Sequence, residues 1–191
     1  TLEAQGHTPI VFSGNPDQVR RQFGLESRHL FPAGIRSILR YLFSAPYRDK
    51  IRGSYEALRS SDAVWFGGGG LFVDSNPKAM MIWWRQWQAV KKAKKPYHIV
   101  ANSFELRSLW WRRILKPWFQ QAQSISVRDR ASKAIAESFG REVSLVDDFG
   151  LRAVDAIRRD ARSCVSTDMR YAHRDVSTDP DNAKRITLAL C

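Results

Sequence analysis

Short apolar segments alternate along residues 8–146 with longer segments in which apolar residues recur at helical spacing. Short apolar runs bounded by turn residues predict buried strands, and the alternation with helices predicts a parallel sheet covered on both faces. The chain is therefore expected to be α/β and Rossmann-like. The predicted strands are 8–12, 63–66, 97–101, 124–127 and 142–146.

Two of the predicted helices carry apolar stripes that are typical of core-facing helices. The first begins at Asn76-Pro77 and ends before Pro96, and the second covers 109–122 with an interruption expected at Pro117. The other predicted helices begin after Pro16 or cover 35–43, 55–59 and 130–139. The residues of the two stripes are Met80, Trp83, Trp84 and Trp87, then Trp111, Leu115, Trp118 and Ala122.

The pattern weakens after Asp148. Residues 151–162 can form a helix, but 163–184 are polar, contain Asp179-Pro180 and have no period, which predicts a linker. The apolar run 185–191 is then expected to begin a second domain that is cut off. The expected organisation is a Rossmann-like domain over 1–162, incomplete at its start, followed by the linker and by this strand.

Charge and cysteine content narrow the classes of function. The net charge is +12, which favours acidic partners such as nucleic acid, an anionic membrane surface, or phosphorylated and carboxylated substrates. The two cysteines, Cys164 and Cys191, are too few for a disulfide framework and favour a reducing compartment. The four histidines lack metal-binding spacing, so no metal site is expected.

The run Gly67, Gly68, Gly69 and Gly70 directly follows the predicted strand 63–66. Glycine permits positive φ and close approach of a ligand, and a strand-to-helix loop is where α/β folds bind anions. The spacing matches neither GxGxxG nor a P-loop. A ligand loop and a tight turn packed on a neighbouring helix are both open interpretations.

Two charged residues near strand ends are candidates for ligand contact. Asp74 could orient a sugar or phosphoryl acceptor, or could serve a helix dipole. Arg128 follows strand 124–127, where its guanidinium could pair bidentately with a carboxylate or phosphate or form a surface ion pair. The next residue, Asp129, is predicted to be a helix N-cap.

The second tryptophan helix also mixes aromatic and cationic residues. Trp110, Arg112, Arg113 and Lys116 give the composition of a helix lying on an anionic membrane interface, while a solvated face is the alternative.

The ordered succession of 62–74, 94–100 and 126–129, followed by Ser132, Gly140 and Asp147, resembles the polysaccharide pyruvyl transferase family. The resemblance implies one half of a GT-B-like architecture. It also implies transfer of a pyruvyl group from phosphoenolpyruvate to a sugar of a cell-surface polysaccharide or its precursor. By the same resemblance, Gly67 to Gly70 and Asp74 would line the acceptor side of the cleft, and Arg128 would bind the donor.

The resemblance predicts no cofactor, because phosphoenolpyruvate is the donor substrate. Expected partners are a saccharide or lipid-linked saccharide acceptor, with peripheral membrane contact and a cytoplasmic location at the inner membrane face. No general acid or base is assigned, and this piece alone is expected to be inactive. A GT-B glycosyltransferase with a nucleotide-sugar donor is the first alternative. A basic nucleic-acid-binding module is a remote one, because no motif of that class occurs and no nucleic-acid partner is expected.

Overall fold

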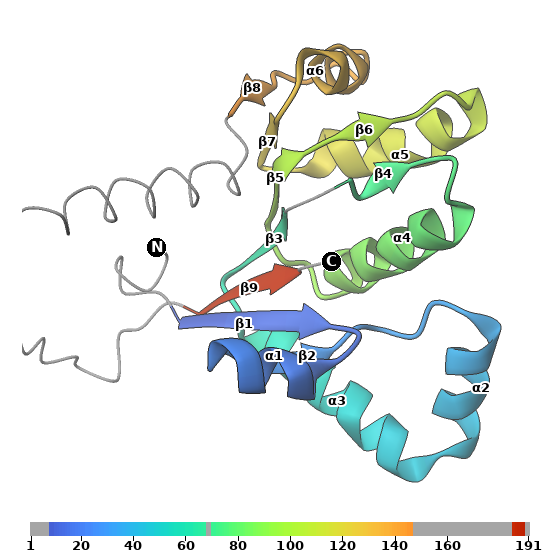
Figure 1. Cartoon of the computed structure of the whole chain (residues 1–191), viewed down its shortest axis with the longest axis vertical. Helices are drawn as coiled ribbons and strands as arrows, with labels where there is room; N and C mark the ends of the chain where they lie inside the picture. Colours follow the sequence, from blue (N-terminus) through green and yellow to red (C-terminus); the bar gives the residue numbers. More distant parts are fainter. Residues whose placement is uncertain (1–7, 68–69, 147–184, 190–191) are drawn as a thin grey trace, which may run out of the picture.

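The centre of the protein is a parallel sheet flanked by helices (Figure 1). The computed structural model describes residues 8–67, 70–146 and 185–189, the last as backbone. Within these residues the strand order is β2-β1-β9-β3-β5-β7-β8, and every described pairing is parallel. This confirms the α/β, Rossmann-like prediction. The sheet strands are β1 Thr8–Ser13, β2 Glu26–His29, β3 Ala63–Gly67, β5 Tyr97–Asn102, β7 Ser124–Val127, β8 Ser144–Leu145 and β9 Arg185–Ala189.

The order of the strands reverses at β9. On one side of β9 lie β1 and then β2, and on the other side lie β3, β5, β7 and β8 in order. In open α/β sheets such a reversal marks the crevice at the carboxyl ends of the strands where ligands bind. Gly67, the last residue of β3, lies beside this point, because β3 neighbours β9 in the sheet (Figure 1).

The helices begin where the sequence supplies caps. The side chains of Asn15, Asn76 and Asp129 accept hydrogen bonds from the first turns of α1, α4 and α6, and proline follows each of the two asparagines. The helices are α1 Pro16–Phe23, α2 Ile35–Phe43, α3 Ala45–Ser60, α4 Pro77–Lys92, α5 Leu109–Gln121 and α6 Arg130–Glu137.

An aromatic cluster forms the core beneath α4 and α5. The Trp118 ring stacks on Trp87 with 5.7 Å between centroids and meets Phe66 and Phe72 edge-on. These rings are almost fully buried. Because buried aromatic rings contribute the largest apolar areas, this cluster fixes both helices against β3 and β5.

Several predictions about local structure were wrong. Helix α5 runs through Pro117 without interruption, because Leu115, Trp118 and Phe119 are fully buried around it and hold the last turn in place. Trp84 is 37% exposed, since the apolar stripe of α4 is narrower than expected. Helix α3 is far longer than 55–59.

Strand β2 of the main sheet was not predicted, and neither were two short elements outside that sheet. Strands β4 (Phe72–Val73) and β6 (Phe104–Glu105) form a separate two-stranded parallel sheet beyond β3 and β5. Each contributes one buried phenylalanine, and the two rings lie 5.1 Å apart. A pair of two-residue strands is too short for an apolar alternation to be recognised.

The final strand is placed differently from the expectation that it begins a second domain. Strand β9 lies inside the sheet, paired in parallel with β1 on one side and β3 on the other. Two flanking strands can satisfy the backbone groups of an apolar segment, which explains why it belongs to the interior of this sheet. The predicted helix 151–162 and linker 163–184 lie outside the described residues.

Candidate functional site

Two of the predicted site residues, Gly67 and Arg128, lie at the carboxyl edge of the sheet. Gly67 is the last residue of β3, Asn102 is the last residue of β5, and Arg128 directly follows β7. Because the three strands are parallel and adjacent, their carboxyl ends meet at one edge.

Close packing surrounds the two described glycines of the glycine run, Gly67 and Gly70. A Cβ atom on Gly67 would lie 3.3 Å from the backbone oxygen of Val100, and one on Gly70 would lie 3.3 Å from Cγ2 of Val73. Gly68 and Gly69 lie outside the described residues. At Gly67 the tight-packing interpretation therefore has a concrete basis, since a side chain would require the β5 backbone to move by a few tenths of an ångström.

Asn102 is a buried polar residue that the sequence analysis missed. Its side-chain amide donates to the backbone oxygen of Phe66 at 2.9 Å and to that of Val100 at 3.2 Å. Its Oδ1 atom is buried and has no hydrogen-bond partner within the described part of the chain. The preceding residue, Ala101, has a φ of 50°, and the pairing of β5 with β7 shifts register there. The sequence signal that could have identified Asn102 is its position as a polar residue at the end of an apolar strand.

A chain of hydrogen bonds joins the ends of β5 and β7 to helix α6. The Nε of Arg128 donates to Oγ of Ser103 at 3.1 Å, and that hydroxyl donates to Oδ2 of Asp129 at 2.9 Å. Oδ2 also accepts from Oγ of Ser132 at 2.7 Å, which in turn accepts from the Phe104 backbone N–H. The network holds the Arg128 guanidinium against the loop that follows β5.

Asp129 is the N-cap of α6, as predicted. Its Oδ1 accepts from the Ser132 backbone N–H at 2.7 Å. Burial alone would raise the pKa of Asp129, but hydrogen bonds from Ser132 and Ser103 and the positive charge of Arg128 together hold that pKa below its usual value. The carboxylate is therefore ionised at neutral pH.

Asp74 clamps the start of helix α5. Its Oδ2 accepts hydrogen bonds from the backbone N–H groups of Arg107 and Ser108, each at 2.6 Å, and its own N–H donates to Glu105 O. A carboxylate that receives N–H groups at a helix start also interacts favourably with the helix dipole. The helix whose start Asp74 binds is α5, although α4 begins at Pro77, closer along the chain.

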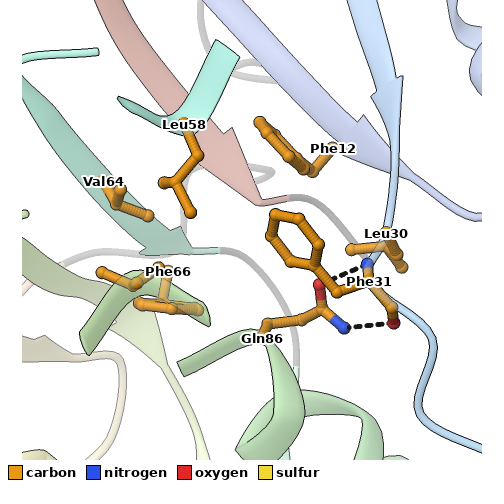
Figure 2. Close-up of a pocket in the computed structure, with 8 residues that line it drawn as sticks. Phe12, Leu30, Phe31, Leu58, Val64, Phe66 and Gln86 are labelled. Carbon is orange, nitrogen blue, oxygen red and sulfur yellow. Dashed lines mark hydrogen bonds between the residues drawn. The ribbon is translucent and has the colours of Figure 1, made fainter. Parts of the chain in front are cut away.

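The apolar cavity in Figure 2 is a packing space in the core. Its volume is about 20 Å³, and Phe12, Phe31, Leu58 and Phe66 are among its walls. The polar side chain on its wall, Gln86, is bound to the Phe31 backbone at both ends, with bonds of 2.9 Å to N and 3.0 Å to O. The cavity therefore offers a polar substrate neither room nor hydrogen-bond partners.

The described residues contain no cluster of three or more His, Cys, Asp and Glu side chains able to hold a metal. His98 lies near the opposite, amino end of β5, where its Nδ1 is 2.8 Å from Ser124 Oγ. Among the same residues no helix combines the length and apolarity needed to cross a membrane.

The comparison with protein families agrees with this architecture. The family model described as polysaccharide pyruvyl transferase matches residues 1–185 of the 191-residue chain. The chain belongs to the polysaccharide pyruvyl transferase family. Searches of curated proteins and of solved structures found no significant match. The family places the protein among transferases of polysaccharide biosynthesis.

Proposed function

We propose that the protein transfers the pyruvyl group of phosphoenolpyruvate to a saccharide, or a lipid-linked saccharide, and releases inorganic phosphate. Membership of the family over 1–185 is the observation that carries this proposal. The carboxyl edge of the sheet also supports the proposal. Arg128 places a guanidinium at this edge, held by its hydrogen bond to Ser103. The strand order reverses along the same edge, which is where open α/β sheets bind ligands.

The reaction balances with two sugar hydroxyls as nucleophiles. A proton adds to the methylene carbon of the donor, one hydroxyl oxygen bonds to C2, the C2–O bond to phosphate breaks, and the second hydroxyl oxygen completes a cyclic ketal. The two hydroxyl protons are matched by one in the new methyl group and one on the released phosphate. No redox partner or cofactor is needed.

In this proposal the residues of the edge bind and orient, and none is assigned as general acid or base. Arg128 pairs with the carboxylate or phosphate of the donor, because its planar fork matches both groups. Gly67 and Gly70 line the acceptor side of the crevice, and Asp74 faces the same side while it positions the start of α5. Gly68 and Gly69 belong to the same proposed loop.

The test is product analysis with phosphoenolpyruvate, a panel of saccharide acceptors and the protein in deuterated water. We expect phosphate release together with a new ketal methyl group that carries one deuterium. Two hydrogens of this methyl group come from the donor methylene, and the third comes from an acid whose proton exchanges with the solvent. Transfer from a nucleotide-sugar with phosphoenolpyruvate unchanged would overturn the proposal and favour the glycosyltransferase alternative.

A further inference from the structure

Helix α2 exposes its apolar residues to solvent. None of its residues is buried, although the apolar positions form one continuous face of the helix. The exposed fractions are 79% for Ile35, 47% for Leu39, 55% for Leu42 and 83% for Phe43. A contiguous exposed apolar patch of this kind usually marks an interaction surface.

A groove extends the patch from α2 to the body of the protein. It has a volume of about 610 Å³, and apolar side chains from three helices line it. Ile38 and Leu42 come from α2, Ile51 and Tyr55 from α3, and Met81 and Trp84 from α4. Figure 1 shows α2 standing away from the sheet at the end of a long connection. The apolar surface is therefore continuous from the outer face of α2 to α4.

The segments that form this apolar surface are rich in cations. Segment 35–52 and helix α4 carry basic residues at 36, 40, 48, 50, 52, 78, 85, 91 and 92, and Asp49 is their one carboxylate. Arg85 and Lys92 line the groove itself. Apolar side chains beside a dense positive charge are the two features of a surface that binds an anionic lipid bilayer.

We propose that α2 and the groove behind it form a docking surface for an anionic lipid bilayer. The apolar face of α2 enters the boundary between headgroups and acyl chains, and the surrounding arginines and lysines lie among anionic headgroups. A second copy of the chain fits less well, because a symmetric contact would bring the same cations together. Nucleic acid would engage the cations but leave Leu39 and Phe43 without an apolar partner.

This inference goes beyond the transferase activity. In Figure 1, α2 lies on the side toward which β1 and β9 point. Because the strands are parallel, the carboxyl edge that carries Gly67 and Arg128 faces broadly the same way. Docking through α2 would bring that edge close to a bilayer. Vesicle binding needs neither donor nor acceptor, so its outcome is independent of the assay for pyruvyl transfer.

Vesicle co-sedimentation with the whole protein tests the proposal. The vesicles contain phosphatidylcholine with or without phosphatidylglycerol. The apolar variant is Leu39→Ser with Phe43→Ser, and the charge variant is Arg36→Glu with Arg40→Glu. Matched controls on α1 are Phe23→Ser, whose ring is 67% exposed, and Arg21→Glu. Circular dichroism and melting temperature establish that each variant is folded.

We expect the wild type to bind vesicles that contain phosphatidylglycerol, and each α2 variant to lose about tenfold in partitioning or more. The α1 controls should partition like the wild type. Equal binding by wild type and α2 variants, or binding to neutral vesicles alone, would overturn the proposal. So would dimers in light scattering that dissociate in the Leu39→Ser, Phe43→Ser variant, because the patch would then be an interface between copies.

Discussion

The side-chain amide of Asn102 donates a 2.9 Å hydrogen bond to the backbone oxygen of Phe66, and so joins the end of β5 to the end of β3. The bond lies one residue before Gly67, where a Cβ atom would make a tight 3.3 Å contact with the Val100 backbone oxygen of β5. Asn102 and Phe66 are both fully buried. The Asn102 side chain of β5 thus holds the end of β3, where the glycine run begins.

Replacing Asn102 by alanine should lower the free energy of unfolding by about 1–3 kcal/mol, because buried groups lose a hydrogen-bond partner. Asn102→Asp should cost more, since the buried side chain would lose its N–H donors and gain a charge. Urea unfolding measures both. Equal stability of wild type and Asn102→Ala would show that the bond does not hold the two strand ends together.

Asp129 should make the protein sensitive to acid. Its pKa is lowered in the folded state, so its contribution to stability is complete above its usual value near 3.8 and is lost as the pH falls through the folded-state pKa. Asp129→Ala should remove that dependence and cost about 0.5–2 kcal/mol as a lost N-cap. Unfolding between pH 2.5 and 7 measures both effects, and an unchanged pH profile in the variant would contradict the assignment.

Asp74→Asn separates a structural role at the start of α5 from orientation of the acceptor. Asparagine keeps an oxygen that can accept from the backbone of Arg107 and Ser108, so a purely structural role predicts nearly normal stability and activity. If the carboxylate also orients the acceptor, activity should fall at least about tenfold while the melting temperature stays close to that of the wild type. Asp74→Ala is the matched control, because it removes the clamp in either case.

The sequence predicted most strands of the sheet because buried parallel strands are short apolar runs separated by caps, but it missed β2, whose sequence Glu-Ser-Arg-His is polar. Strand β7 and helix α2 have the predicted bounds, and the Asp129 cap is confirmed. The position of β9 depends on pairing between distant segments, for which a single sequence carries no local signal.

The candidate site was only partly predictable for a related reason. Gly67 and Arg128 stood out because glycine runs and strand-end cations are local features. Asn102 and Ser103 act through contacts with Phe66 and Asp129, which are far away along the chain. The exposure of α2 could not be predicted either, because its apolar periodicity is the same as that of a buried helix.

The start of α5 is a second surface that could contact anionic vesicles. Leu109 is 79% and Trp110 62% exposed, while Arg112 Nε already donates to the Leu106 backbone at 2.8 Å. Since a cation near an anionic surface contributes about 1 kcal/mol, Arg112→Glu with Arg113→Glu should weaken vesicle flotation. Flotation equal to that of wild type would leave these residues as an ordinary solvated face.

Arg128→Lys tests the proposed donor contact most directly. An ammonium cannot reproduce the two-pronged guanidinium, so binding of phosphoenolpyruvate should weaken even though the charge is kept. A charge-assisted bond is worth roughly 1.5–3 kcal/mol, which corresponds to an affinity loss of about tenfold or more. Calorimetric titration of phosphoenolpyruvate measures it, with Arg28→Lys, in an exposed pair with Glu26, as the matched control.

The melting temperature decides how a loss of affinity in Arg128→Lys is interpreted. The Nε bond from Arg128 to Ser103 belongs to the network that caps α6, so a structural role predicts a lower melting temperature. Donor binding instead predicts weaker affinity with little change in melting temperature, because a half-buried strand-end arginine contributes little apolar burial. Unchanged affinity would remove Arg128 from the donor site and leave it as part of the network that joins β5, β7 and α6.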